Sequence, residues 1–323
     1  MYLLNISMKL DLTKKYIDLD TVNKFIEYNS DFSNVTPISE PHFDVIFMSY
    51  NEKDADKHYE LLKKRVPNAK RVNGVKGILN AYNACREIAE TPYYFIVEGD
   101  SMICRDFDFK LPTEWLQSIA SLDPGELNYD YVKARHCITW NSINPINGEI
   151  KNHSPIGLAF KSDNPYNWKS DTNFNIPHSY NNDISNEISS KSIEADSFKV
   201  QGIPCNTIAS IDFFNSSPYD AWKTGFRIGN KLTFRLLNLN LNLKEEERLN
   251  HWATVGYEQK NGKYCIEGVT YGIKCAKICN NWIEEYKNTS DNYDWLKETF
   301  EREYGTQYNT NSNSKKAVTN SCY

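Results

Sequence analysis

One stretch of the first hundred residues alternates between apolar runs and amphipathic segments, and it constrains the fold more than any other feature. The runs at 43–50, 69–74 and 93–100 have the apolar content of strands. The segments between them, 51–67 and 77–90, place their apolar residues at helical spacing. A β-α-β-α-β order of this kind predicts a parallel sheet with right-handed crossovers.

The predicted strands all end in polar residues. Ligands of parallel sheets bind at the carboxyl ends of the strands, and these ends are 49–51, 73–76 and 98–100. No glycine-rich phosphate loop follows the first strand. The third ends in Glu-Gly-Asp, and burying such charge is costly unless it is paired. This triplet is therefore either a solvated turn or an anchor for a divalent cation and the diphosphate of a nucleotide-sugar.

The composition narrows the class of protein. Of 323 residues, 40% are hydrophobic, as in soluble globular proteins. The net charge of −5 counts against a protein that coats nucleic acid through phosphate contacts alone. The eight cysteines include no CxxC pair, which predicts reduced thiols in a cytoplasmic protein rather than a zinc site or a disulfide frame. No apolar segment is long enough for a membrane span, so no membrane partner is expected.

The rest of the chain carries weaker patterns. The predicted domain plan is a polar N-terminal extension (1–40, with a short helix at 19–28), a main domain (41–285, with a nucleotide-sugar-binding half at 41–110 and an acceptor-binding half at 128–285), a C-terminal helix (286–306) and a disordered tail (307–323). Further predicted elements are a helix at 111–122, strands at 129–140, 153–161 and 207–214, a polar turn at 141–150, a long loop at 162–197, strand or loop at 252–272, and helices at 269–286 and 293–304.

Ser217, followed by a proline, predicts the start of another helix with the serine as N-cap. Trp222 and Phe226, and likewise Lys223 and Arg227, are four residues apart, so aromatic and basic side chains form adjacent stripes. Either the aromatic rings pack in a core with the cations in water, or the cations contact a diphosphate or a DNA phosphate.

Several segments together resemble a known family. They are "FDVIFMSYNE" and "GILNAYNACREIAETPYYFIVEGDSMI", with "GVKGI" at 74–78 and the segments 140–148, 214–227 and 252–256. They are similar to GT-A-type glycosyltransferases of tailed bacteriophages over roughly 43–280. The resemblance implies an α/β fold with a Rossmann-like, mostly parallel central sheet flanked by helices, with mixed C-terminal additions. Glu98 departs from the family's Asp-x-Asp motif, which leaves Asp100 as the stronger candidate for a direct metal ligand.

The resemblance also implies roles for single residues. Nucleotide-sugar binding would fall to Ser49, Tyr50, Asn51, Lys76, Asn80, Glu98 and Asp100. The acceptor or sugar pocket would be formed by Trp140, Asn141, Asn144, Trp222, Lys223 and Arg227. The metal ligands would be Asp100 and Glu98, to which the sequence adds His251 as a further candidate. Asp212 is the candidate general base if the reaction inverts the anomeric centre; otherwise it orients the sugar.

The implied activity is a metal-dependent hexosyl- or pentosyltransferase, in the host cytoplasm if the chain is phage-encoded. Its donor would be a UDP-sugar, with UDP-arabinose and UDP-glucose as candidates, and its cofactor Mn²⁺ or Mg²⁺. Members of the group add sugars, arabinose among them, to 5-hydroxymethylcytosine, so the expected acceptor is a hydroxymethylated or already modified pyrimidine of phage DNA. Trp140, Tyr166 and Trp168 are candidates to fill the gap left by an unstacked base.

Two other functional classes remain open. One is a glycosyltransferase that acts on protein or a surface glycan. The other is a non-catalytic binding protein with a nucleotide-sugar fold, which the atypical Glu98 makes conceivable.

Overall fold

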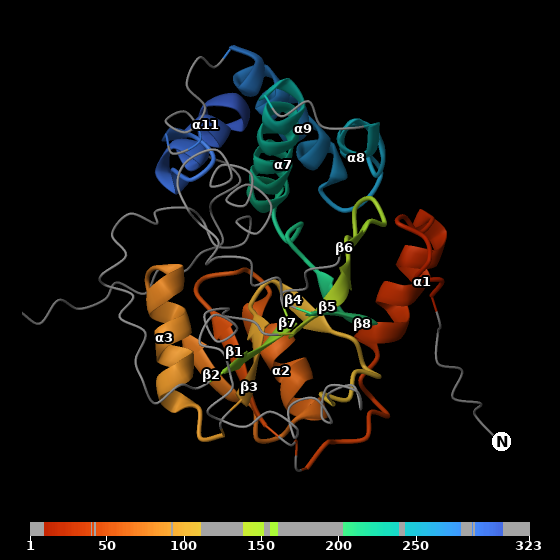
Figure 1. The fold of residues 1–323 in the computed structure, drawn as a ribbon, viewed down its shortest axis with the longest axis vertical. Coiled ribbons are helices and arrows are strands. Elements are labelled where there is room, and N and C mark those ends of the chain that lie inside the picture. The colour runs from red at the N-terminus through yellow and green to blue at the C-terminus, as the bar shows by residue number, and fades with distance from the viewer. Residues whose placement is uncertain are drawn as a thin grey trace, which may run out of the picture. The chain divides into compact units, whose positions relative to one another are not determined.

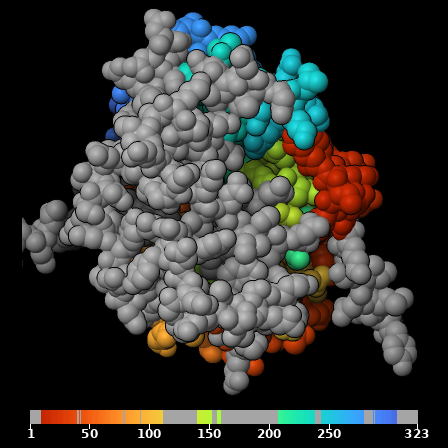
Figure 2. All heavy atoms as spheres, in the orientation of Figure 1, coloured from red at the N-terminus to blue at the C-terminus, as the bar shows by residue number. Residues whose placement is uncertain are grey.

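The structure is a computed structural model that describes residues 10–39, 41, 43–91, 93–110, 138–151, 156–160, 203–238, 243–278, 286 and 288–305. The chain divides into two compact units, Met1–Phe214 and Asn215–Tyr323. Figure 1 traces the described residues from red to blue, and Figure 2 shows them as spheres. The boundary falls inside the domain predicted at 41–285, at the point where strands give way to helices.

The first unit is a mixed α/β structure. Its elements are α1 (Leu19–Ser30), β1 (Asp44–Ser49), α2 (Ala55–Arg65), β2 (Lys70–Asn73), α3 (Ile78–Ile88), β3 (Tyr93–Glu98), β4 (Ser101–Ile103), β5 (Ile138–Ile143), β6 (Ile150–Lys151), β7 (Ile156–Phe160) and β8 (Ile203–Asp212). The predicted β-α-β-α-β order is confirmed, because β1 pairs in parallel with both β2 and β3.

The described strands form one eight-stranded sheet in the order β2-β1-β3-β7-β5-β8-β4, with β6 paired to β5. Since β7 is antiparallel to both β3 and β5, and β8 is parallel to β5, the strands β1, β2, β3, β5 and β8 share one direction. Their carboxyl ends therefore lie on one rim. The sheet is mixed rather than simply parallel, because β4, β6 and β7 run the opposite way.

The connection from β3 to β4 curls this sheet. Only Gly99 and Asp100 separate the two strands in the sequence, yet β7, β5 and β8 lie between them along the sheet. Neighbouring strands are about 4.8 Å apart, so two residues cannot span those spacings across a flat sheet. The sheet must bend back on itself, which brings the end of β3 close to the end of β8.

Two apolar clusters cover the two faces of β1 and β3. Phe47 and Phe95 pack with Leu62 of α2, whereas Ile46 and Ile96 pack with Cys85 of α3. Alternate side chains of a strand point to opposite faces, so α2 and α3 cover opposite sides of the sheet.

The segment predicted as a polar N-terminal extension packs on the first unit. The predicted helix is α1, and its Val22 and Phe25 are buried in the same cluster as the α2 face. The backbone also joins it to the β5–β6 turn, where Ile17 N donates to Gly148 O at 2.9 Å and Ile150 N donates to Lys15 O at 2.9 Å. Tertiary burial overrides the polar composition of this stretch.

The remaining strand predictions are largely confirmed. The strand at 153–161 is β7, and that at 207–214 begins earlier, as β8. The predicted turn at 141–150 is shorter, because β5 continues to Ile143 and the turn occupies 144–148. Predictions for 111–122, 129–137, 162–197 and 307–323 lie outside the described residues, as do Tyr166 and Trp168.

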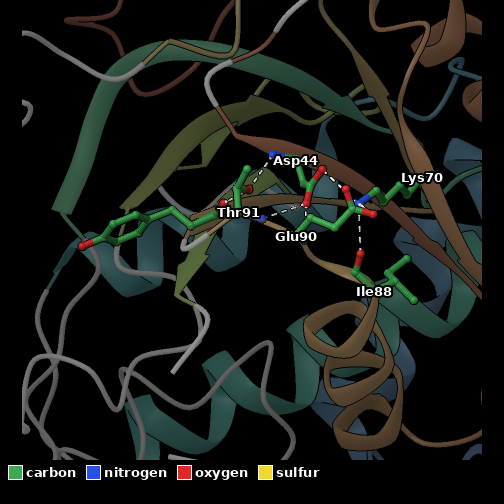
Figure 3. Close-up of polar contacts among 6 residues, drawn as sticks. Asp44, Lys70, Ile88, Glu90 and Thr91 are labelled. Carbon is green, nitrogen blue, oxygen red and sulfur yellow. Dashed lines mark hydrogen bonds and ion pairs between the residues drawn. The ribbon is translucent and has the colours of Figure 1, made fainter. Parts of the chain in front are cut away.

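A polar network fixes the amino ends of β1, β2 and β3 (Figure 3). The Asp44 carboxylate accepts hydrogen bonds from the backbone N–H groups of Glu90 and Thr91 and pairs with Lys70 Nζ at 3.1 Å. Lys70 also reaches Glu90 at 3.0 Å and Ile88 O at 3.0 Å. Burial raises the pKa of Asp44, but these hydrogen bonds and the lysine charge outweigh it, so the pKa lies below its ordinary value.

We predict that Asp44→Ala lowers the free energy of unfolding by about 2–3 kcal/mol at neutral pH, because it leaves two backbone donors without their charged acceptor. A carboxylate with a depressed pKa stabilises the fold above its unfolded pKa, and this stabilisation is lost as the pH falls through the folded pKa. The difference from the wild type should therefore shrink below about pH 4. Thermal unfolding measured across this range checks the prediction, with Asp56→Asn as the control because Asp56 is an exposed ion-pair residue. An equal loss at acidic and neutral pH would contradict it.

The second unit is helical in its described part. It contains α7 (Pro218–Asn238), α8 (Leu243–Thr254), α9 (Gly262–Ile278) and α11 (Tyr293–Tyr304). The predicted N-cap is confirmed, since Asp220 N donates to Ser217 Oγ at 3.1 Å, and α11 matches the helix predicted at 293–304. None of the helices in the described residues has the length and apolarity needed to cross a membrane.

The prediction of strand or loop at 252–272 holds for the loop at 255–261 but is wrong for 262–272, which form the first part of α9, where Gly268 and Gly272 serve helix contact. Pairs of glycines four residues apart lie where α7 and α9 pack (Figure 1): Gly225, Gly229, Gly268 and Gly272. A Cβ on Gly229 would lie 2.2 Å from Val269 O, and one on Gly272 would lie 2.2 Å from Phe226 O. Each helix backbone thus occupies the space that a side chain on the other would need.

We predict that Gly229→Ala destabilises the second unit by about 1–3 kcal/mol or more, since the added methyl group can be accommodated only if the helices move apart. Thr270→Ala, on the exposed side of α9, should change stability by less than about 0.5 kcal/mol. Urea unfolding followed by far-UV circular dichroism measures both. Wild-type stability in Gly229→Ala would contradict the close helix contact.

Candidate functional site

The rim begins at the end of β1, where Ser49 is held in place. Its Oγ donates to Asn73 Oδ1 at 2.9 Å and accepts hydrogen bonds from Nε and Nη2 of Arg71, both at 3.1 Å. The side chain is buried, whereas the following Tyr50 is 48% exposed and Asn51 is exposed. Ser49 therefore joins β1 to β2, whereas Tyr50 and Asn51 are accessible at this end of the strand, and their nucleotide contacts stay a prediction.

The middle residue of the acidic triplet permits a close approach between strands. A Cβ on Gly99 would lie 2.6 Å from Glu52 Oε2 and 2.9 Å from Ser49 Cβ. Glu52 is fixed by Tyr50 N, which donates to its Oε2 at 2.8 Å, and His58 Nδ1 lies 3.2 Å from Gly99 O. The turn that carries the two acids is thus packed against the end of β1.

The two acids of the triplet have different surroundings. Glu98 shares the α3 face of β3, where Tyr82 OH donates to its Oε1 at 2.9 Å. Burial, and then the charge of Glu98, raises the pKa of Cys85 to about 12, so that side chain remains a neutral thiol. Glu98 is therefore engaged by α3 and is not directed solely at a ligand.

Asp100 lies beside Asp212 because β4 pairs with β8. Ser101 is the direct partner of Asp212, and Phe213 N donates to Asp100 O at 2.7 Å. Burial raises the pKa of Asp100 well above its ordinary value, and the charge of Asp212 raises it further. Lys151 opposes the shift, but its ammonium is already paired with the Asp212 carboxylate. The carboxyl rim thus carries negative charge that its neighbouring cation offsets only in part.

The fit of a divalent metal to this rim depends on Asp100. No group of three or more His, Cys, Asp or Glu side chains in the described ranges is arranged to hold a metal by itself. Mg²⁺ in nucleotide enzymes is commonly held by one or two carboxylates together with substrate phosphates. Because Tyr82 donates to Glu98 and Lys151 pairs with Asp212, Asp100 is the rim acid that would hold a cation arriving with a diphosphate, and the metal site stays a prediction.

Lys76 and Asn80 lie just beyond the end of β2, at the same rim. Both are exposed, and Asn80 Nδ2 donates to Lys76 O at 3.0 Å. The positions of these two residues are compatible with nucleotide binding, and their contacts with a nucleotide stay a prediction.

The structure gives packing and turn roles to residues predicted to form the sugar or acceptor pocket. Trp140 is 2% exposed, and its ring packs at 5.5 Å from both Phe95 and Phe107. Asn144 Oδ1 accepts from Ile146 N at 2.8 Å within the turn after β5. Asn141, also buried, lies on β5. Their predicted contacts with a sugar or a flipped base stay predictions.

The other predicted residues belong to the second unit. Trp222 is buried and stacks on Phe226 with ring centroids 5.4 Å apart, which is the packing alternative. The cations are not simply in water: Lys223 Nζ pairs with Asp220 at 3.0 Å, and Arg227 is buried. His251 lies in the last turn of α8. Contributions of Lys223, Arg227 and His251 to the rim of the first unit stay predictions.

Three residues at the rim were not predicted: Tyr82, Glu52 and Lys151. Tyr82 lies in the helix predicted at 77–90, and nothing in the sequence indicated that its hydroxyl reaches Glu98. Lys151 meets Asp212 only through the pairing of β5 with both β6 and β8. Within the residues that the structure describes, Cys85, Cys104, Cys265 and Cys275 are in no disulfide.

Comparisons with protein-family models, with curated proteins and with solved structures found no match to this chain.

We predict that Asp100→Asn raises the midpoint of thermal unfolding at neutral pH, because it removes a charge that burial and neighbouring acids disfavour. A carboxyl whose folded pKa is raised costs stability above that pKa and nothing below its unfolded pKa. The gain should therefore disappear below about pH 4. Asp212→Asn is the matched comparison and should be destabilising, since it breaks the pair with Lys151. An Asp100→Asn variant less stable than the wild type at neutral pH would contradict the charge argument.

Proposed function

We propose that the protein is a glycosyltransferase that uses a nucleotide-sugar donor, with the site at the carboxyl rim of the first unit. One observation carries the proposal: Asp100, at the end of the third strand of a β-α-β-α-β unit, lies in partly offset negative charge beside Asp212. A divalent cation bound with a diphosphate would neutralise that charge. The resemblance of 43–280 to GT-A-type phage glycosyltransferases supports the same reading.

Each rim residue would have a different role in such a reaction. Tyr50 and Asn51 present exposed groups for the nucleoside, and Asp100 would hold Mn²⁺ or Mg²⁺. The metal ion would offset the charge that develops on the leaving diphosphate. Asp212 would take the proton of the attacking hydroxyl in an inverting reaction, with Lys151 fixing the orientation of its carboxylate. In a retaining reaction Asp212 would orient the sugar.

The proposed acceptor is a hydroxymethylated or already modified pyrimidine of DNA, and it is supported by the resemblance alone. A protein or glycan acceptor is the alternative within the same chemistry. A non-catalytic binding protein is the second alternative, favoured by the engagement of Glu98 with Tyr82 instead of an open pair of acids.

Release of UDP tests the proposal directly. The full chain is incubated with Mn²⁺ and UDP-glucose, UDP-galactose, UDP-arabinose or UDP-N-acetylglucosamine, with and without DNA that contains 5-hydroxymethylcytosine. Mass spectrometry of the nucleosides should find a sugar on the modified base. UDP release that requires a glycan or protein instead would select the first alternative. Binding of UDP without any release would select the binding protein.

We predict that Asp100→Ala lowers the rate of sugar transfer at least about 100-fold, since the variant loses the proposed metal ligand. Addition of Mn²⁺ in excess should restore little of the rate. Asp20→Asn, an exposed acid in the first turn of α1, is the control and should keep wild-type turnover. Intact turnover in Asp100→Ala would show that the metal site is wrongly placed.

A further inference from the structure

Two serine hydroxyls near the rim are buried without a partner. The Oγ atoms of Ser101 and Ser142 make no hydrogen bond to the parts of the chain that the structure describes, and the two residues are 1% and 0% exposed. An unsatisfied buried hydroxyl costs about 1–3 kcal/mol, so such groups usually have a partner in the working protein.

Strand register places both serines on the face of the sheet that carries Asp212. Ser101 is the direct cross-strand partner of Asp212 on β8. Ser142 on β5 is the cross-strand partner of Ser210 on β8 and of Lys151 on β6. Ser210 lies two residues before Asp212, so the two side chains are on the same face of β8. The contact between Lys151 and Asp212 agrees with this assignment. We call these residues the serine patch: Ser101, Ser142, Ser210, Lys151 and Asp212.

The charge of the serine patch limits the ligand that it fits. Lys151 and Asp212 neutralise each other, so the patch offers neither a free cation for a phosphate nor a free acid for a metal. A serine hydroxyl donates one hydrogen bond and accepts up to two. Groups that match this pattern also donate and accept through hydroxyls, and they are uncharged. A sugar ring has this chemistry.

We propose that the serine patch is the subsite for the sugar ring of the nucleotide-sugar donor, with Ser101 and Ser142 as its hydrogen-bonding residues. This inference rests on the proposed function and extends it from the diphosphate to the sugar. Asp100 lies next to Ser101 in the sequence, so the diphosphate site and the sugar subsite are adjacent along one turn. The geometry of β4 and β8 thereby sets the order of diphosphate, then sugar.

Ordered water is the competing explanation, because buried water commonly satisfies hydroxyls of this kind. The two explanations predict different effects of removing the hydroxyls on the affinities for UDP and for UDP-sugars. A water-filled patch would leave UDP and UDP-sugars equally affected by substitution. A sugar subsite would affect only ligands that carry the sugar.

The test compares Ser101→Ala, Ser142→Ala and the double variant with the wild-type full chain. Calorimetry with Mn²⁺ present gives the Kd of UDP and of the four UDP-sugars named above. We expect the Kd of the preferred UDP-sugar to rise about fivefold to tenfold for each hydroxyl removed, with the Kd of UDP unchanged. Thr233→Val is the matched control, because Thr233 Oγ1 is also buried without a partner among the described residues but lies on α7 of the second unit.

Each other outcome has a definite meaning. Equal changes for UDP and UDP-sugar, or no change for either, overturn the sugar subsite and leave the proposed function standing. Loss confined to the KM of the acceptor also overturns it, because the patch would then bind the acceptor. Failure of the wild type to bind UDP or any UDP-sugar overturns the proposed function and the subsite together. Ser101→Cys and Ser142→Cys keep the buried volume, should show the same loss, and replace any alanine variant that does not fold.

Discussion

The short connection from β3 to β4 is the constraint on which the rest of the first unit depends. Only two residues join β3 to β4, although three strands, β7, β5 and β8, lie between them in the sheet. The sheet therefore curls, and the end of β3 comes close to the end of β8. That meeting places Asp100 beside Asp212 and makes Gly99 necessary, because Ser49 and Glu52 occupy the space of a side chain there. The charge repulsion at the rim is thus a consequence of topology as well as of composition.

Acidic residues at the two ends of the parallel strands have opposite electrostatic surroundings. At the amino ends, Asp44 is surrounded by donors and a lysine, and its pKa is depressed. At the carboxyl ends, burial and then neighbouring acids raise the pKa of Asp100. The first arrangement stabilises the fold without a ligand, whereas the second costs stability at neutral pH, a cost that the proposed cation would relieve. Stabilising groups at one end of the strands and destabilising groups at the other are expected in a protein whose binding site lowers the stability of the unliganded fold.

The sequence was sufficient for local order and insufficient for long-range contact. The alternation of apolar runs predicted β1, α2, β2, α3 and β3, because periodicity is a local property. It failed at 262–272, where Gly268 and Gly272 look like turn residues but allow α7 and α9 to approach closely. It also could not place Lys151 at Asp212, since that contact requires the register of β5 with both β6 and β8. The position of Asp100 directly after β3 was predictable, because it follows from a single strand end.

The neutral serine patch and the charged Asp100 complement each other in chemical terms. A nucleotide-sugar has a strongly anionic diphosphate joined to an uncharged, hydroxyl-rich ring. Along the turn from β3 to β4, an acid whose charged form is disfavoured by burial and by neighbouring acids is followed directly by a serine hydroxyl without a partner among the described residues. A site for a diphosphate alone would not require the serine hydroxyls, and a site for a sugar alone would not require the acid. Their adjacency on one turn therefore favours a single ligand that carries both groups.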